Sequence, residues 1–309
     1  MDMFFEGSKE VFTRLFEKQR LLAARDSRHS NIRPLLLILS GTMRGVYGGG
    51  QVIALERFGL SEVFDTVVGV STGTPTAAYF LAKQAVLGTS IYCEECITDK
   101  FISPWRLKVD VGYLADVFRG HQSFKMLDQQ AIHSSRSAFF AAATCAQTGE
   151  GILIDAKEAK PDIVQAIKAS IAIPGFTKPV RIGDRHYLDG AGAHPFPFRV
   201  SMQCFAPTDM LILANCPNED KAKLGTRNMV LTVLATLGLP RLVRSTFINH
   251  RKRFMEELSF LRLHGCRCSI FWSDREVSGF ERNQRKLVTA KERATEHLSE
   301  LLAEARGLI

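Results

Sequence analysis

The sequence lacks any long uninterrupted hydrophobic segment, so it gives no sign of a membrane-spanning helix. Its longest apolar stretches are residues 35–39 and the threonine-interrupted residues 229–239, both far short of the roughly 20 residues that cross a bilayer. The amino terminus carries Asp2 and Glu6 where a secretory signal would carry basic residues. We therefore expect a cytoplasmic protein that is soluble or peripheral at a membrane.

The sequence also lacks a sign of a disulfide framework, because its number of cysteines is odd. Seven cysteines in 309 residues fit a reduced intracellular compartment. Two pairs have spacings that could bring four sulfur ligands to zinc, but they lack the usual glycines and one pair alternates across a predicted strand. We therefore expect no metal site at these pairs, which are Cys93 with Cys96 and Cys266 with Cys268.

Acidic residues are outnumbered, and the formal net charge is +8. This excess favours anionic partners such as acidic lipid head groups, nucleic acids or acidic proteins. No nucleic-acid recognition motif is present, so we expect no nucleic-acid partner. Basic and apolar residues alternate with helical character over residues 241–254. That segment is either a solvated helix covering the core or a patch that contacts an anionic membrane.

Apolar runs typical of buried strands alternate with stretches of helical periodicity, which predicts an α/β protein. We expect a three-layer α/β/α fold with a mainly parallel central sheet and a helical carboxy-terminal extension. With no repeat or low-complexity linker, residues 1–309 should form one domain, with a catalytic core at about 33–215 and a helical part at about 220–309. The predicted strands are residues 35–39, 65–68, 137–145, 151–155, 180–182, 186–188, 210–214 and 268–272, and the predicted helices lie within residues 1–31, 46–58, 76–83 and 163–172.

One serine lies in a context that is typical of a catalytic nucleophile. Residues 69–73 read Gly-Val-Ser-Thr-Gly, between a β-branched predicted strand and a predicted helix. A serine on such a tight turn presents its hydroxyl above the sheet, and the glycines avoid clashes with neighbouring backbone. Ser71 is therefore the candidate nucleophile of an acyl transfer, with the amino end of a helix behind it.

A second loop follows the predicted strand at residues 35–39. Residues 40–45 read Ser-Gly-Thr-Met-Arg-Gly and precede a predicted helix, so their backbone N–H groups should point into the space above the sheet. Such a loop can stabilise an oxyanion or bind a phosphate. Because neither the P-loop sequence nor the Gly-x-Gly-x-x-Gly spacing is present, a nucleotide site is the weaker interpretation.

A base is expected after the predicted hairpin at residues 180–188. Asp189 follows its second strand and precedes Gly-Ala-Gly, which places a carboxylate at the rim where the serine turn opens. Histidines after Asp189 offer a second choice of base, although none has a local context that marks it. These are His194, His250, His264 and His297.

Four motifs, in this order, resemble the patatin-like phospholipase family: residues 40–45, residues 69–73, residues 169–176 (Ala-Ser-Ile-Ala-Ile-Pro-Gly-Phe) and residues 189–191 (Asp-Gly-Ala). The resemblance covers roughly residues 34–197. It implies a Ser-Asp dyad without a catalytic histidine, in which Ser71 attacks an ester carbonyl and Asp189 takes the proton. It also places Gly41 and Thr42, with Arg44 nearby, in the oxyanion loop.

The resemblance implies a serine lipid acyl hydrolase of the phospholipase A or lysophospholipase type, acting through an acyl-serine. Its substrate would be a phospholipid or another acyl-ester lipid, reached by peripheral contact with an anionic membrane. No metal or organic cofactor is implied.

Two departures from the family pattern keep an alternative open. Ser40 and Thr42 stand where the family usually has glycines, and a β-branched Thr42 resists a positive φ. If the loop needs that conformation, the oxyanion hole is distorted and activity is weak. His194 stands where the family more often has Asp or Asn, as a structural substitute or a second base. The alternative is a catalytically weak or inactive member that binds lipid or protein.

Overall fold

The computed structural model describes residues 4–103, 108–218, 234–264 and 267–307. Its main elements, in chain order, are β1 (Phe4–Gly7), α1 (Glu10–Ala23), β2 (Pro34–Ile38), η2 (Thr42–Arg44), α2 (Gly45–Arg57), β3 (Thr66–Val70), α3 (Gly73–Leu81), α4 (Ala85–Thr89), η3 (Ser90–Tyr92), β4 (Ile102–Ser103), β5 (Lys108–Val109), α5 (Val111–Phe118), α6 (Gln129–Ser134), β6 (Ala138–Cys145), β7 (Gly151–Asp155), α7 (Ile163–Ser170), β8 (Val180–Ile182), β9 (Arg185–Asp189), α8 (Phe198–Phe205), β10 (Asp209–Ala214), α10 (Arg241–Ile248), α11 (His250–His264), β11 (Cys268–Trp272) and α12 (Gln284–Gly307).

Within these described ranges, nine strands form one sheet in the order β1-β11-β10-β2-β3-β6-β9-β8, with β7 also paired to β6. The central strands, from β11 to β6, are parallel to one another. The outer strands β1, β7, β8 and β9 pair in antiparallel fashion. The sheet is therefore mixed, with the predicted parallel arrangement at its centre.

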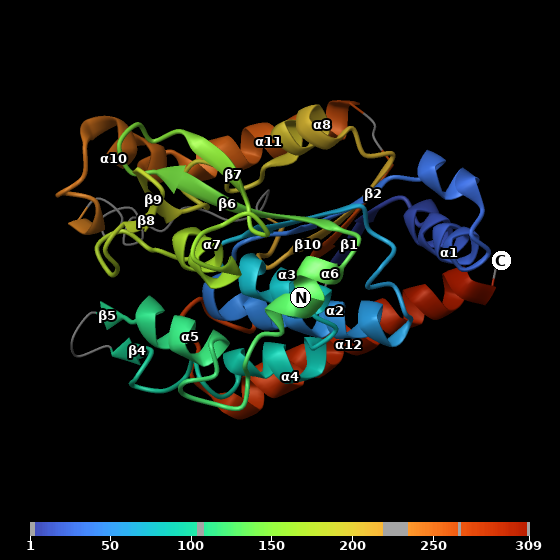
Figure 1. Cartoon of the computed structure of the whole chain (residues 1–309), viewed down its shortest axis with the longest axis horizontal. Helices are drawn as coiled ribbons and strands as arrows, with labels where there is room; N and C mark the ends of the chain where they lie inside the picture. The colour runs from blue at the N-terminus through green and yellow to red at the C-terminus, as the bar shows by residue number, and fades with distance from the viewer. Residues whose placement is uncertain (1–3, 104–107, 219–233, 265–266, 308–309) are drawn as a thin grey trace.

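Helices cover both faces of this sheet, which confirms the predicted three-layer α/β/α class. In Figure 1, α8, α10 and α11 lie above the sheet, and α2, α3, α4, α5 and α12 lie below it. Strand β2 shows why the sheet must be covered twice. Leu36 and Ile38 join the core on one face, and Leu35 and Leu37 join the core on the other. An all-apolar strand of this kind is stable only when both of its faces are buried.

The carboxy-terminal part of the chain packs directly on the predicted catalytic core. Strand β11 lies in the central sheet, and α12 packs against α2. A Cβ on Gly50 of α2 would lie 2.2 Å from the carbonyl oxygen of Lys291 on α12. The glycines that weaken α2 by local propensity therefore allow two helices to approach closely, and tertiary packing outweighs that propensity.

Some elements differ from those predicted. Residues 1–31 were expected to supply a helix alone, but β1 precedes α1 and pairs with β11 at the sheet edge. A four-residue edge strand carries too short a pattern to be recognised without its distant partner. Residues 229–233 of the apolar stretch lie outside the described part of the chain. No helix within the described part is both long and apolar enough to span a bilayer.

Candidate active site

Ser71 lies on the turn between β3 and α3, in the strand–turn–helix arrangement that the sequence predicts. Its φ is +51°, a left-handed conformation that non-glycine residues adopt mainly where surrounding structure enforces it. Crowding explains the flanking glycines. A Cβ on Gly69 would lie 2.4 Å from the Cα of Thr74, and a Cβ on Gly73 would lie 2.1 Å from the carbonyl oxygen of Ile38.

The hydroxyl of Ser71 meets the carboxylate of Asp189 across 118 positions of sequence. Ser71 Oγ donates a hydrogen bond of 2.6 Å to Asp189 Oδ2. Asp189 is the last residue of β9, and its second oxygen, Oδ1, accepts the N–H of Ala191 at 2.8 Å. Both carboxylate oxygens therefore have donors, which fixes the orientation of the group. A hydroxyl held on an acceptor carboxylate is the arrangement that nucleophilic catalysis requires.

Burial changes the acidity of this carboxylate. Asp189 is only 5% exposed, and burial raises its pKa from the ordinary 3.8 to about 6, although the hydrogen bonds from Ser71 and the Ala191 N–H act in the opposite direction. The group is still largely ionised at neutral pH, and it is a stronger base than an exposed aspartate.

The predicted oxyanion loop lies beside the serine turn. The Gly41 N–H donates to Thr72 Oγ1 at 3.1 Å, and a Cβ on Gly41 would lie 2.3 Å from the carbonyl oxygen of Asn215. Position 41 therefore requires glycine. Arg44 Nε makes a long contact of 3.4 Å with the Gly41 carbonyl, so the guanidinium of Arg44 lies against the loop.

Thr42 adopts a φ of +53°, the conformation that a β-branched residue resists. Its hydroxyl donates to the Gly41 carbonyl at 2.6 Å, which partly supports the strained turn. Within the described part of the chain, neither the N–H of Thr42 nor that of Thr72 donates to a protein acceptor. The N–H groups of Thr42 and Thr72 are thus available to an oxygen of a substrate, whereas that of Gly41 is already used.

His194 is placed differently from Asp189. Its ring lies against Gly151 of β7, where a Cβ would approach Nε2 to 2.3 Å. Burial, with a smaller effect of Arg253, lowers the pKa of His194. Among the hydrogen bonds of the described residues, none joins Ser71 to a histidine, and the Ser71 hydroxyl points to Asp189. The fold therefore pairs the serine with the aspartate.

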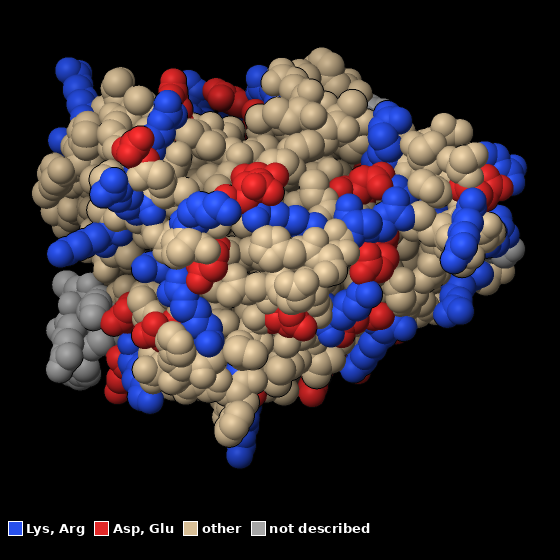
Figure 2. All heavy atoms as spheres, viewed as in Figure 1, with Lys and Arg blue, Asp and Glu red and all other residues tan. Residues whose placement is uncertain are grey.

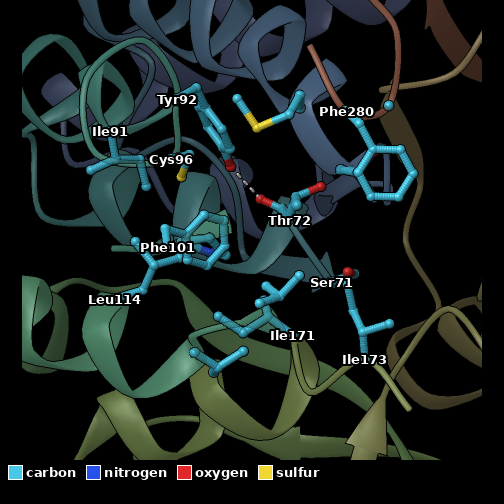
Figure 3. Close-up of a pocket in the computed structure, with 16 residues that line it drawn as sticks. Ser71, Thr72, Ile91, Tyr92, Cys96, Phe101, Leu114, Ile171, Ile173 and Phe280 are labelled. Atoms are coloured by element: carbon cyan, nitrogen blue, oxygen red, sulfur yellow. Dashed lines mark hydrogen bonds between the residues drawn. The ribbon is translucent and has the colours of Figure 1, made fainter. Parts of the chain in front are cut away.

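An apolar pocket opens beside Ser71 (Figure 3). It encloses about 590 Å³, counting its open mouth. In the close-up, Ile91, Phe101 and Leu114 lie across the pocket from Ser71, and Phe280 lies near Thr72. These lining residues come from segments that are far apart in the sequence, and no local motif marks them. Sequence reasoning therefore named no substrate-binding residue, and only the fold brings these side chains together.

Asn215 is a second residue that sequence reasoning missed. It is fully buried and directly follows β10. Its Nδ2 donates to the carbonyl of Leu39 at 2.7 Å, and its Oδ1 accepts the N–H of Gly48 at 2.8 Å. It thus links the end of β2, where the oxyanion loop begins, to helix α2. The sequence shows only an asparagine that follows a predicted buried strand. This pattern does not reveal which backbone groups the asparagine side chain bonds.

The described residues contain no cluster of three or more His, Cys, Asp or Glu side chains suited to a metal ion. Cys93 and Cys96 are buried in the main core, and Cys266 lies outside the described ranges. The site consists of a serine, a carboxylate, backbone N–H groups and apolar side chains. That set suits acyl transfer from a substrate with an apolar chain.

Comparison with known proteins gives one clear result. A family model described as patatin-like phospholipase matches residues 36–202. No curated protein matches the chain. Among solved structures, VipD from Legionella pneumophila aligns with 10% identity over 88% of this chain and 67% of that chain, with a TM-score of 0.42. A similarity of this size carries no inference about function.

Proposed function

The chain belongs to the patatin-like phospholipase family, since the family model covers more than half of it, and on that premise we propose a serine lipid acyl hydrolase that uses a Ser71–Asp189 dyad. Family membership implies lipid acyl hydrolase activity. The phospholipase A or lysophospholipase type, acting on phospholipid or another acyl ester, is the finer proposal. The observation that carries the proposed dyad is the 2.6 Å hydrogen bond from Ser71 Oγ to Asp189 Oδ2.

In the first step, Ser71 Oγ attacks the carbonyl carbon of the ester, and its proton passes to Asp189 Oδ2. The raised pKa of the buried carboxylate favours this transfer. The tetrahedral intermediate collapses to an acyl-serine as the alcohol leaves, taking the proton from Asp189. Water then attacks the acyl-serine while Asp189 again accepts the proton. The fatty acid is released as Asp189 returns that proton to Ser71 Oγ.

The negative oxygen of each intermediate needs donors that are already in place. We assign the N–H groups of Thr42 and Thr72 to this role, because neither donates to another acceptor within the described chain. The amino end of α3 lies directly behind Ser71 and adds a favourable partial charge. Gly41 acts indirectly, since its N–H binds Thr72 Oγ1 and so ties the oxyanion loop to the residue after the nucleophile.

The apolar pocket beside Ser71 supplies the recognition of the acyl chain. Its walls are aliphatic and aromatic, so a hydrocarbon chain gains free energy by leaving water there, roughly 0.8 kcal/mol for each buried methylene group. A short polar acid gains no such benefit. This difference supports a lipid ester over a small water-soluble ester as the substrate.

Labelling with a fluorophosphonate probe tests the proposed nucleophile. The probe should modify the wild-type protein at one serine, and Ser71→Ala should abolish labelling, because the hydroxyl that attacks phosphorus is gone. Ser201→Ala is the matched control. Ser201 is fully buried, and its hydroxyl has no hydrogen-bond partner in the described part of the chain, so this variant should label as the wild type does.

Failure of the folded wild type to react would favour the alternative, a weak or inactive member of the family that binds lipid or protein. One observation gives that alternative its physical basis. Thr42 holds a positive φ that strains the oxyanion loop.

We also propose that the end of the molecule carrying α10 contacts an anionic membrane. Leu242 on α10 is 69% exposed, and Leu237 just before it is 54% exposed. Arg241 is exposed beside them, and Val243 and Phe247 on the opposite side of α10 pack on Leu188, the residue before Asp189. Helix α10 is thereby packed on β9, the strand that carries the proposed base. Its exposed leucine beside a basic residue suits contact with an anionic lipid surface.

The overall charge also favours contact with an anionic membrane. Figure 2 shows acidic and basic side chains interspersed over this view, with Lys and Arg side chains projecting at its left end, where α10 lies in Figure 1, and at its right end. The whole chain carries a net charge of +8. Anionic lipids therefore attract the protein, and the exposed leucines at the α10 end of the molecule can enter the interface.

The double variant Arg241→Glu, Leu242→Asp should bind anionic vesicles at least about tenfold more weakly at low salt, since it removes an apolar contact and reverses a charge. Co-sedimentation with vesicles of phosphatidylcholine and phosphatidylglycerol measures this. Arg20→Glu is the control, because α1 lies at the opposite end of the molecule in Figure 1. Equal vesicle binding by the double variant and the wild type would contradict the proposed membrane contact.

A further inference from the structure

One buried hydroxyl outside the proposed dyad contacts the serine turn directly. Ser170 is the last residue of α7 and is fully buried. Its Oγ accepts the backbone N–H of Ser71 at 3.0 Å and lies 2.7 Å from Thr74 Oγ1. The Thr74 N–H in turn donates to the Ser71 carbonyl at 2.8 Å. Both ends of the tight turn that presents the nucleophile are therefore held on a single side-chain oxygen.

The backbone at the same point holds the strand end that carries the base. The carbonyl of Ser170 accepts the Gly190 N–H at 3.1 Å, and the carbonyl of Ala172 accepts the Asp189 N–H at 2.9 Å. Ser170 is thus bonded through its side chain to the Ser71 turn and through its main chain to the residue after Asp189. Within the described part of the chain, no strand pairing joins these two positions directly, since β6 lies between β3 and β9.

We propose that Ser170 is a positioning residue that sets the distance between the hydroxyl of Ser71 and the carboxylate of Asp189. This inference rests on the proposed dyad mechanism and deepens it. The two partners lie at the ends of β3 and β9, which both pair with β6. The carboxyl end of α7 adds a second link, because it is bonded to the residue that follows each of these strands. The Ser170 hydroxyl joins the nucleophile to that element.

The backbone conformation of Ser71 explains why this contact matters. A φ of +51° is unfavourable for a serine, so the turn keeps it only while its neighbours hold it. Without the Ser170 oxygen, the Ser71 N–H is buried and lacks an acceptor, which is costly in a dry site. The turn then relaxes toward a conformation that satisfies this N–H, and Ser71 Oγ moves relative to Asp189 and the oxyanion loop.

Ser170→Ala tests this proposal, because it removes one oxygen atom and leaves the size of the side chain almost unchanged. We expect kcat on a short-chain p-nitrophenyl ester, and the rate of fluorophosphonate labelling, to fall about 10- to 100-fold, as for other small misplacements of a reacting group. KM should change less than about twofold, since the pocket is intact. Amide exchange in a peptide spanning residues 69–74 should become faster.

Ser137→Ala is the matched control. Ser137 is also a fully buried serine, and its hydroxyl donates to the carbonyl of Phe64 at 2.6 Å, just before β6 and far along that strand from the site. It should lose stability but keep the wild-type kcat, labelling rate and exchange of residues 69–74. A loss of activity common to both variants would show a general structural effect and overturn the positioning role.

Thr74→Val gives a second measure that does not depend on Ser170→Ala folding. It keeps the side-chain shape and removes the second anchor of the Ser170 hydroxyl, so labelling should slow by a smaller factor, about 3- to 10-fold. Wild-type rates and unchanged exchange in both variants would overturn the proposal while leaving the dyad in place. If the wild type itself fails to label, the dyad mechanism fails, and amide exchange at residues 69–74 alone decides whether Ser170 holds the turn.

Discussion

Replacing Asp189 by asparagine is expected to lower kcat for ester hydrolysis by about 10²- to 10⁴-fold, the range that positioned general bases contribute. Asparagine matches the shape of aspartate and can still bond to Ser71 Oγ, but it cannot accept the proton that the nucleophile must lose. KM should change little, because the acyl pocket is untouched. Steady-state kinetics on a short-chain ester, with active-site titration to count intact enzyme, measures the effect.

His194→Ala is the comparison that decides which group is the base. The ring of His194 packs on Gly151 and has no bond to Ser71 within the described chain, so its removal should cost stability and leave kcat within a fewfold of the wild type. A retained rate in Asp189→Asn together with a collapse in His194→Ala would exclude the proposed dyad and identify the histidine as the base.

The same Asp189→Asn variant should be more stable than the wild type at neutral pH. Burial raises the pKa of Asp189 to about 6 in the folded protein, above its value of about 3.9 in an unfolded chain. The folded state therefore disfavours the ionised form, and any stability from the protonated group is present below pH 4 and lost as pH rises through 6. Ionised Asp189 costs up to about 3 kcal/mol at pH 7.

Denaturant unfolding at two pH values checks this expectation. Asp189→Asn should raise the free energy of unfolding at pH 7, and the gain should shrink toward zero near pH 4, where aspartate in the folded state is protonated. A destabilised variant at pH 7 would mean that the carboxylate contributes more through its two hydrogen bonds than it costs through burial. The ionised Asp189 side chain would then lower the free energy of unfolding by less than we expect.

The pH dependence of kcat/KM should report the same carboxylate. The base must be ionised, so kcat/KM should be constant near neutral pH and fall about tenfold for each pH unit below 6, reaching about a hundredfold loss at pH 4. The inflection should lie near pH 6 because burial raises the pKa of Asp189 to about 6. Stopped assays on a short-chain ester, with a check that the protein stays folded at low pH, measure the profile.

Two outcomes would contradict this interpretation. An inflection near the ordinary aspartate value of 3.8 would mean that water reaches the carboxylate and that the site is more open than the 5% exposure of Asp189 indicates. The persistence of the inflection in the residual activity of Asp189→Asn would assign it to a different group. In that variant, the profile should be flat through pH 6.

The sequence predicted the fold class and most of the strands because their signals are local. The all-apolar run that became β2, and the Gly-Asp turn between β8 and β9, require only neighbouring residues to be recognised. Strand β1 and the short strands β4 and β5 gave no such pattern, since their pairing partners supply most of what defines them. Family motifs likewise identified Ser71 and Asp189 as candidates, because these motifs are defined by residue types and their order, which the sequence alone contains.

The sequence by itself determined the candidate nucleophile, the candidate base and the glycine loops, because short motifs identify them. It also predicted the parallel centre of the sheet, because apolar runs alternate with helical stretches. Tertiary structure decided the rest. It brought Ser71 against Asp189 in preference to His194, formed the apolar pocket, and placed Ser170 and Asn215 as supports for the two loops. Each of these depends on side chains that meet only after the strands take their order in the sheet, and no local pattern encodes that order.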